Sequence, residues 1–231
     1  MIIIQKHLAE RGICSRREGE RLVLEKKVTV NGKQALIGQL IDPEKDIVKV
    51  LGHSEKPKMT VAIHKPRGVV CSTNPSEGKT IGQLLPQFAN LSIVGRLDKA
   101  SEGLLLLTSD GLITRAVTSN EHLIEKEYLV GTREKLFGGL LKDMEKGMKI
   151  DGEQTLPCTT ELRDDRQSFL ITLREGKKHQ IRRMCDAKKL TVTMLKRLRI
   201  GPVRLLKMRP GEFRQLTEEE IQTIKSTLAS A

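Results

Sequence analysis

The chain has 231 residues, a formal net charge of +12 and a sequence pI of about 9.7. This length allows a buried core in one or two domains, and the charge favours a polyanionic partner, with nucleic acid preferred to a membrane surface. No apolar run approaches the roughly 20 residues of a membrane span, and residues 1–4 are too short for a signal-peptide core. We therefore expect a cytoplasmic protein without a membrane segment.

Two helices are predicted near the start of the chain. The first covers residues 5–10. The second opens at Ser15, whose hydroxyl suits an N-cap and which is followed three positions later by Glu18, the spacing of a capping box. This second helix carries three arginines that we expect to contact RNA: Arg16, Arg17 and Arg21. A solvated basic face that binds nothing is the alternative.

Short strands follow these helices. Asn31-Gly32 is typical of a tight hairpin turn, and residues 46–50 alternate as a strand. Two helices followed by short strands, with arginines along the second helix, resemble the ribosomal-protein S-four-type (α-L) RNA-binding domain. The resemblance assigns residues 1–50 to such a domain. Residues 51–59 have no periodic apolar pattern, so we expect a flexible linker that makes the domain a tethered second grip on RNA.

Strands and helices alternate irregularly over residues 60–231, which predicts an α+β domain rather than a regular parallel repeat. Strands are expected over residues 61–63, 91–97, 104–108, 127–130, 168–173 and 191–200. Helices are expected over residues 80–85, 110–118, 134–146, 178–188 and from Thr217 onward. Thr217 and Glu220 have the spacing of a capping box for the last helix.

Metal and cofactor motifs are missing from the sequence. Its four cysteines and five histidines are scattered without the paired spacing of a zinc site. The chain also lacks a glycine-rich dinucleotide fingerprint and a phosphate-cradling Gly-Lys-Ser/Thr loop. These patterns argue against nicotinamide and P-loop chemistry, and we expect no metal, no disulfide and no cofactor.

Basic residues are concentrated near the end of the chain. Residues 174–209 contain thirteen Lys and Arg against two acids, so this segment alone carries +11. We expect it to line a groove that follows a phosphate backbone, and RNA binding should weaken as salt rises.

Asp98 is the first catalytic candidate from the residues alone. It lies in a turn bounded by Gly95 and Gly103, between two strand-like runs and beside Arg96. An aspartate carboxylate is ionised at neutral pH and can act as nucleophile or base without a metal. The alternative is an aspartate that only caps its own turn.

Four motifs occur in order along residues 60–231: Lys65-Pro66-Arg67-Gly68, Gly95-Arg96-Leu97-Asp98, Glu125-Lys126-Glu127-Tyr128 and His179-Gln180-Ile181-Arg182-Arg183-Met184. Together with the α-L domain in front, they resemble the RsuA/RluB/RluF-type pseudouridine synthases over nearly the whole chain. The resemblance implies an extended, mainly antiparallel or mixed sheet with flanking helices. It also implies cofactor-free isomerisation of a specific uridine in RNA to pseudouridine.

The resemblance assigns catalytic roles to three residues. Asp98 matches the family's catalytic aspartate, and Arg182 matches the arginine that orients this carboxylate, which a guanidinium can bind through two parallel hydrogen bonds. Tyr128, the only tyrosine, matches the residue that stacks on the flipped uracil. The alternatives are a backbone contact to RNA for Arg182 and a core position in a strand for Tyr128.

Three further residues are expected to contact RNA. Arg96 should lie on the same side of an extended strand as Asp98 if the strand persists that far, and by resemblance it helps to displace the target base and hold its phosphate. A surface ion pair is its alternative role. Arg183 is expected to face phosphate. Lys65 is expected at the floor of the pocket and is counted with the RNA contacts.

The leading hypothesis is therefore a monomeric pseudouridine synthase that acts on ribosomal RNA. The residues around Cys14 and Tyr128 resemble the RluB/RluF branch of the family, which implies large-subunit RNA, while small-subunit and transfer RNA stay open. A non-catalytic RNA-binding factor for ribosome assembly, built on the same scaffold, is the alternative. An S-adenosylmethionine-dependent RNA methyltransferase with the same α-L domain is a third hypothesis, but the glycine-rich loop it needs is missing.

Overall fold

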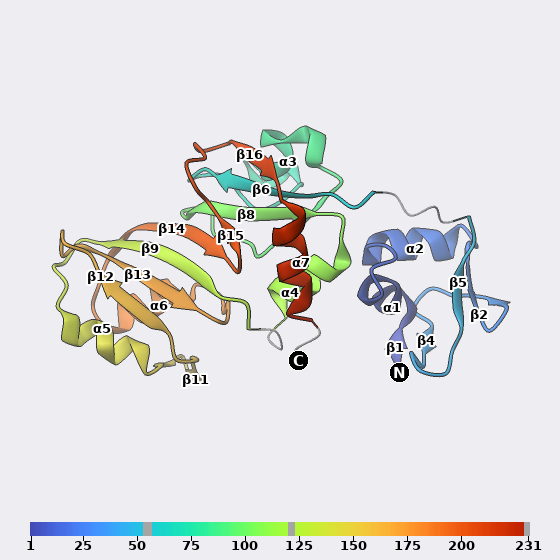
Figure 1. Ribbon diagram of the computed structural model, residues 1–231, viewed down its shortest axis with the longest axis horizontal. Coiled ribbons are helices and arrows are strands. Elements are labelled where there is room, and N and C mark those ends of the chain that lie inside the picture. The colour runs from blue at the N-terminus through green and yellow to red at the C-terminus, as the bar shows by residue number, and fades with distance from the viewer. Residues whose placement is uncertain (53–56, 120–122, 229–231) are drawn as a thin grey trace.

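The computed structural model describes residues 1–52, 57–119 and 123–228 (Figure 1). The first fifty residues form a small module at one end of the molecule. Its elements are β1 (Ile2–Ile3), α1 (Ile4–Glu10), α2 (Arg16–Leu24), β2 (Val28–Val30), β3 (Lys33–Gln34), β4 (Leu40–Ile41) and β5 (Val48–Val50). The two helices pack on these strands around a small apolar core that includes Ile4, Leu8 and Ile41.

Local sequence signals explain the elements of the module. The Ser15 hydroxyl accepts a hydrogen bond from the Glu18 backbone N–H at 3.2 Å, as an N-cap should. The Glu18 carboxylate pairs with Arg21 instead of returning to Ser15, so only half of the expected capping box forms. Asn31 and Gly32 both have a left-handed φ, 51° and 79°, and they join β2 to β3 as a hairpin.

The rest of the chain builds one nine-stranded sheet in the order β12-β13-β9-β14-β8-β6-β16, with β7 added to β8 and β15 added to β14. Its strands are β6 (Thr60–Lys65), β7 (Ser92–Val94), β8 (Glu102–Thr108), β9 (Lys126–Thr132), β12 (Thr159–Leu162), β13 (Ser168–Leu173), β14 (Val192–Ile200), β15 (Val203–Arg204) and β16 (Phe213–Gln215). A separate hairpin consists of β10 (Lys149–Ile150) and β11 (Glu153–Gln154). The fold is α+β with a mixed sheet, as expected.

Five α-helices flank this sheet: α3 (Ile81–Leu84), α4 (Gly111–Thr118), α5 (Gly138–Glu145), α6 (Gln180–Ala187) and α7 (Glu218–Ser226). Two short 3-10 turns, Pro75–Glu77 and Pro86–Phe88, complete the helical segments of the described residues. The predicted capping box of Thr217 and Glu220 forms in full at the start of α7. None of the helices in the described ranges is both long and apolar enough to cross a membrane.

Two predicted elements are shorter than expected, for identifiable reasons. The strand predicted over residues 91–97 ends at Val94, because Gly95 takes a φ of +65°. The helix predicted from residue 134 starts only at Gly138. Its first predicted residue, Glu134, instead holds Thr191, accepting hydrogen bonds at 2.7 and 2.9 Å from the backbone N–H and the hydroxyl.

The sheet consists of two antiparallel halves that meet along one parallel pairing, β14 with β8. At this seam the backbones approach unusually closely. A Cβ on Gly103, whose φ is +109°, would lie 2.3 Å from the carbonyl oxygen of Arg197. Only glycine can occupy such a position. The seam brings residues 95–103 beside β14 and β9, which come from much later in the chain.

The N-terminal module contacts the sheet domain at the start of α4. A Cβ on Gly111 would lie 2.6 Å from the carbonyl oxygen of Ala9 in α1, so the two helices touch through backbone. Lys58, in the segment that joins the module to β6, forms an ion pair with Asp110 at 3.7 Å. The module is therefore packed against α4, which differs from the expected flexible tether. Residues 53–56 of the predicted linker lie outside the described residues.

Candidate active site

Asp98 lies in a tight turn at the mouth of the seam. Its carbonyl oxygen accepts a hydrogen bond from the Ser101 N–H at 3.0 Å, which closes the turn just before β8. Because β7 has already ended at Val94, Arg96 and Asp98 do not share the face of a strand. The prediction that placed them on one side of a strand is therefore wrong. Arg96 is exposed at the rim of the cleft that contains Asp98.

The Asp98 carboxylate faces two basic side chains from the segment that opens α6. His179 Nε2 lies 3.3 Å from Oδ1, and Arg182 Nε lies 3.9 Å from Oδ2. The carboxylate is 38% exposed, so it is open to a substrate from one side and held from the other. This arrangement fixes the direction of the carboxylate before any substrate arrives.

Arg182 contacts Asp98 less directly than the sequence suggests. We expected two parallel hydrogen bonds from its guanidinium to the carboxylate. Instead, Arg182 Nη2 donates to the Ser101 hydroxyl at 3.2 Å, and only Nε approaches the acid. Arg182 therefore bridges the two ends of the Asp98 turn and also neutralises its charge.

His179 lies closer to the Asp98 carboxylate than Arg182 does, and sequence reasoning assigned it no role. It has a left-handed φ of 53° at the N-cap of α6, a conformation that costs a non-glycine residue energy. That backbone geometry directs the imidazole toward Asp98. The only signal in the sequence was its place in the same motif as Arg182.

Buried cations hold the Asp98 turn from below. The ammonium of Lys65 is fully buried and donates to the carbonyl oxygens of Ser101 at 2.7 Å and Pro66 at 2.9 Å. Burial lowers the pKa of Lys65 from its ordinary value. In this position Lys65 cannot touch RNA, which corrects its assignment as an RNA contact. It does lie beneath the pocket, as the floor position required.

Arg197 on β14 is the second buried cation, and sequence reasoning missed it. Its side chain is 1% exposed and donates to the carbonyl oxygens of Leu104, at 2.7 Å, and Gly95. A further contact of 3.5 Å joins its Nη1 to the Tyr128 hydroxyl, and its guanidinium lies 5.9 Å from the centre of the Tyr128 ring. Arg197 thus links the Asp98 turn, the seam and Tyr128.

Tyr128 is 8% exposed on β9, where it pairs with Ile171 of β13 and Arg197 of β14. It lines the same cleft as Asp98, a hollow of about 650 Å³. Lys126, two residues earlier on the same face of β9, also lines this cleft. Burial and the nearby Arg197 lower the pKa of Lys126 to about 8.

Arg183 points away from the cleft that contains Asp98. Its guanidinium pairs with Asp151 at 2.7 Å and donates to the carbonyl oxygens of Ile150 at 3.2 Å and Lys178 at 3.3 Å. Through these bonds, Arg183 attaches the β10–β11 hairpin to α6. In this conformation Arg183 supports the scaffold, and its expected contact with phosphate stays a prediction.

The basic segment 174–209 does not form an uninterrupted positive stripe. Several of its cations pair with acids from other segments: Arg174 and Arg199 with Glu125, Lys177 with Glu153, Lys188 with Asp143, and Lys196 with Glu102. The net charge counted along the sequence is therefore partly neutralised in space. The thirteen cations do not act together on a single groove.

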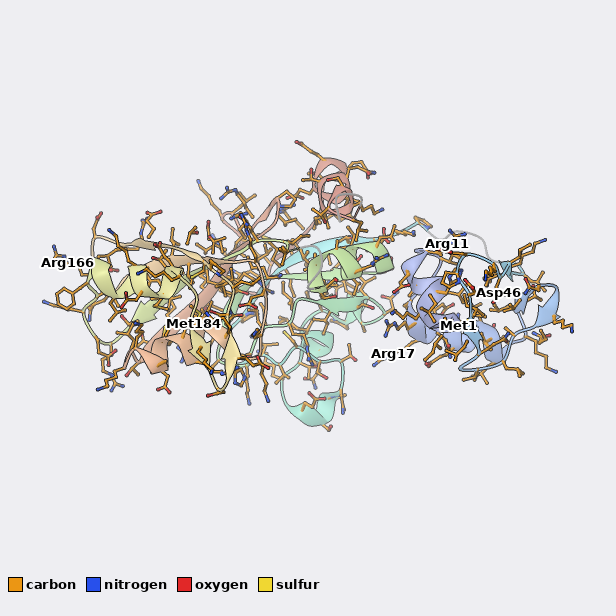
Figure 2. The ribbon with its side chains drawn as sticks, turned by 90° about the horizontal axis from the view of Figure 1, so that it is seen from below. Met1, Arg11, Arg17, Asp46, Arg166 and Met184 are labelled. Carbon is orange, nitrogen blue, oxygen red and sulfur yellow. The ribbon has the colours of Figure 1, made fainter. Side chains whose placement is uncertain are left out.

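The three arginines of α2 are all exposed. Arg21 pairs with Glu18 and Glu25 of its own helix. Arg16 and Arg17 form no ion pair with any residue in the described ranges. Figure 2 shows Arg17 on the side of the module that faces the rest of the chain.

Comparisons with known proteins agree with this architecture. A family model described as RNA pseudouridylate synthase matches residues 59–187, and an S4 domain model matches residues 4–47. The dual-specificity RNA pseudouridine synthase RluF of Escherichia coli is 36% identical over 94% of this chain and 76% of its own length. An uncharacterized RNA pseudouridine synthase of Aquifex aeolicus is 35% identical over 94% of this chain and 91% of its own.

A solved structure extends this similarity to the fold. The crystal structure of a pseudouridylate synthase superimposes with a TM-score of 0.73 and 30% sequence identity, covering 97% of this chain and all of that one. The similarity therefore includes both the N-terminal module and the sheet domain.

Proposed function

Because the chain belongs to the RNA pseudouridylate synthase family, we propose that it isomerises a specific uridine of ribosomal RNA, with large-subunit RNA favoured, and that Asp98 is its catalytic carboxylate. The observation that carries this proposal is that Asp98 and Tyr128 line one cleft and that Arg182 lies beside Asp98, with its Nε 3.9 Å from Oδ2. They come from three separate segments of the chain. A scaffold that only bound RNA would not need them together.

The reaction requires that the uracil leave C1′ through N1 and rejoin it through C5. The N1–C1′ bond breaks, the C5–C1′ bond forms, and the proton on C5 is lost while N1 gains one. In this proposal Asp98 acts on the uridine through its carboxylate, whether on the sugar carbon, on the base or on a sugar proton. Arg182 puts a positive charge beside this carboxylate, and His179 Nε2 lies 3.3 Å from its other oxygen.

Tyr128 contacts the flipped base, and the buried cations support the turn that carries Asp98. The Tyr128 ring forms one wall of the cleft, so a flipped uracil can stack on it, a contact worth about 1–3 kcal/mol. Arg96 at the rim is free to enter the gap in the RNA and to hold its phosphate. Lys65 and Arg197 keep the Asp98 turn rigid while the base rotates. Lys65 binds the Ser101 carbonyl of the turn, and Arg197 binds the carbonyls of Gly95 and Leu104 on its two flanks.

The test is the replacement Asp98→Asn, which keeps the shape of the side chain and removes its charge. We expect pseudouridine formation in a large-subunit ribosomal RNA transcript to fall by at least roughly a thousandfold, while RNA affinity stays within about threefold. Asp164→Asn, in an exposed turn of β12–β13, is the matched control and should retain full activity. Pseudouridine formation by Asp98→Asn at the wild-type rate would refute the assignment.

A further inference from the structure

A second hollow lies between the N-terminal module and the sheet domain. It has a volume of about 1180 Å³ and is bordered on one side by α1 and α2 and on the other by α4 and the residues around β7. Four residues line both this groove and the cleft of Asp98: Cys71, Ile93, Thr118 and Ser119. The groove and the cleft therefore share a wall and form one path across the molecule.

The groove carries a net positive charge once its ion pairs are taken into account. Its acids each have a cation beside them: Glu10 pairs with Lys6, Glu18 with Arg21, and Asp110 with Lys58 and Lys225. Three exposed arginines on its walls, Arg16 and Arg17 on α2 and Arg115 on α4, form no ion pair with any described residue. Unpaired guanidiniums on facing walls are suited to bind phosphate oxygens.

The backbone contact between α1 and α4 fixes the width of the groove. Gly111 is the first residue of α4, and the missing side chain is what allows the Ala9 carbonyl to approach. Leu112 next to it packs within 3.3 Å of the position that a Cβ on Gly12 would take. The two walls therefore hold a defined distance instead of moving on a linker.

From these observations we propose that the groove holds the RNA backbone next to the target uridine, with Arg115 of α4 gripping phosphate opposite Arg16 and Arg17 of α2. The inference rests on the proposed function, since it takes the strand in the groove to continue from the uridine at Asp98. It assigns an RNA contact to Arg115 of α4, which lies outside the four sequence motifs that resemble the family. It also makes the N-terminal module one wall of the substrate site and not a separate grip.

The first test measures RNA affinity and its salt dependence for Arg115→Gln and Arg17→Gln with a full-length large-subunit ribosomal RNA transcript. Each variant should bind roughly tenfold more weakly, and the slope of log affinity against log salt should fall by about 1 per arginine. Arg166→Gln is the matched control, because Arg166 is exposed at the opposite end of the molecule (Figure 2). Unchanged affinity and slope in Arg115→Gln would overturn the inference.

The second test changes the geometry of the groove without removing a charge. Gly111→Ala keeps a helical residue at the start of α4 but places a methyl group against the Ala9 carbonyl, so the module must shift. Michaelis constants should rise severalfold on the long transcript and much less on a short hairpin that carries only the modified uridine. An equal change on both RNAs would contradict a role for the groove.

These measurements separate the two proposals. If wild-type protein forms no pseudouridine in the ribosomal transcript, the proposed function fails regardless of the groove. If wild-type protein is active and the arginine variants bind like Arg166→Gln, the function stands and the groove inference fails.

Discussion

Lys126 is a buried lysine without a carboxylate beside it among the described residues. Its ammonium donates to the Ile124 carbonyl oxygen at 3.1 Å, and the nearest charge that affects it is the cation Arg197. Both burial and repulsion favour the neutral form, which explains why its pKa falls to about 8.

The low pKa of Lys126 predicts how stability depends on pH. Between pH 8 and 10.5 the folded protein has released this proton while the unfolded chain still holds it, so the free energy of unfolding rises with pH. Comparison with Lys126→Met isolates this contribution. From pH 7 to pH 10, urea denaturation should show wild type gaining about 2 kcal/mol relative to the variant.

The buried thiols act in the opposite direction over the same range. Burial raises the pKa of Cys14 and Cys158 to about 11, so their contribution to stability falls above pH 9. Both proteins share this effect, and it cancels in the difference. A difference that does not change with pH would show that Lys126 keeps an ordinary pKa.

His179 offers a second prediction about a single residue. His179→Ala should lower kcat by roughly tenfold to a hundredfold with little change in KM, because the Asp98 carboxylate loses its nearest partner. His179→Asn should recover much of the rate, since asparagine tolerates the left-handed backbone and can still donate a hydrogen bond. If kcat is unchanged in both variants, His179 does not position Asp98.

At the scale of secondary structure, the parallel seam between β8 and β14 controls the site. Gly103 permits the seam, and Arg197 of β14 contacts both the Asp98 turn and Tyr128 across it. The sequence placed Gly103 in a turn, whereas it lies inside β8. A glycine inside a strand indicates a close approach of another backbone, but which strand approaches is a property of the tertiary fold.

Gly103→Ala should therefore be among the most destabilising small substitutions in the chain. The added methyl group meets the backbone of Arg197 in a conformation that alanine avoids, at a cost of about 3 kcal/mol or more. Thermal unfolding should shift down by roughly 6–12 °C. Gly139→Ala in α5, where no atom lies within 4 Å of the new Cβ, should be neutral or stabilising. Equal melting temperatures would contradict the role of the seam.

Helices and strands with a clear sequence pattern could be predicted. Elements that form only because another strand or side chain packs against them could not. The strand over residues 168–173 and the capped start of α7 agree with the sequence pattern. Strands of two to four residues, such as β10, β11 and β15, are too short to show a period. Asp98 could be chosen from its turn and motif. Arg197 could not, because a buried arginine that binds carbonyls looks like any other cation in a basic segment.

At the scale of the whole molecule, the family and the α+β class could be predicted because motifs and composition can be recognised in the sequence alone. The packing of the N-terminal module on α4 could not, since its only trace is a glycine at the start of a helix. The division of the chain at residues 51–59 stays a prediction. So does the monomeric state.

The buried cations beneath Asp98 are satisfied by peptide carbonyls and not by acids. Carbonyl oxygens belong to every residue type, so no point mutation elsewhere can delete them. Among the described residues, neither Lys65 nor Arg197 forms an ion pair with a carboxylate, although Asp98 and Glu102 act on Lys65 through space. The two buried cations beneath Asp98 should therefore keep their positions when the surrounding sequence changes during evolution.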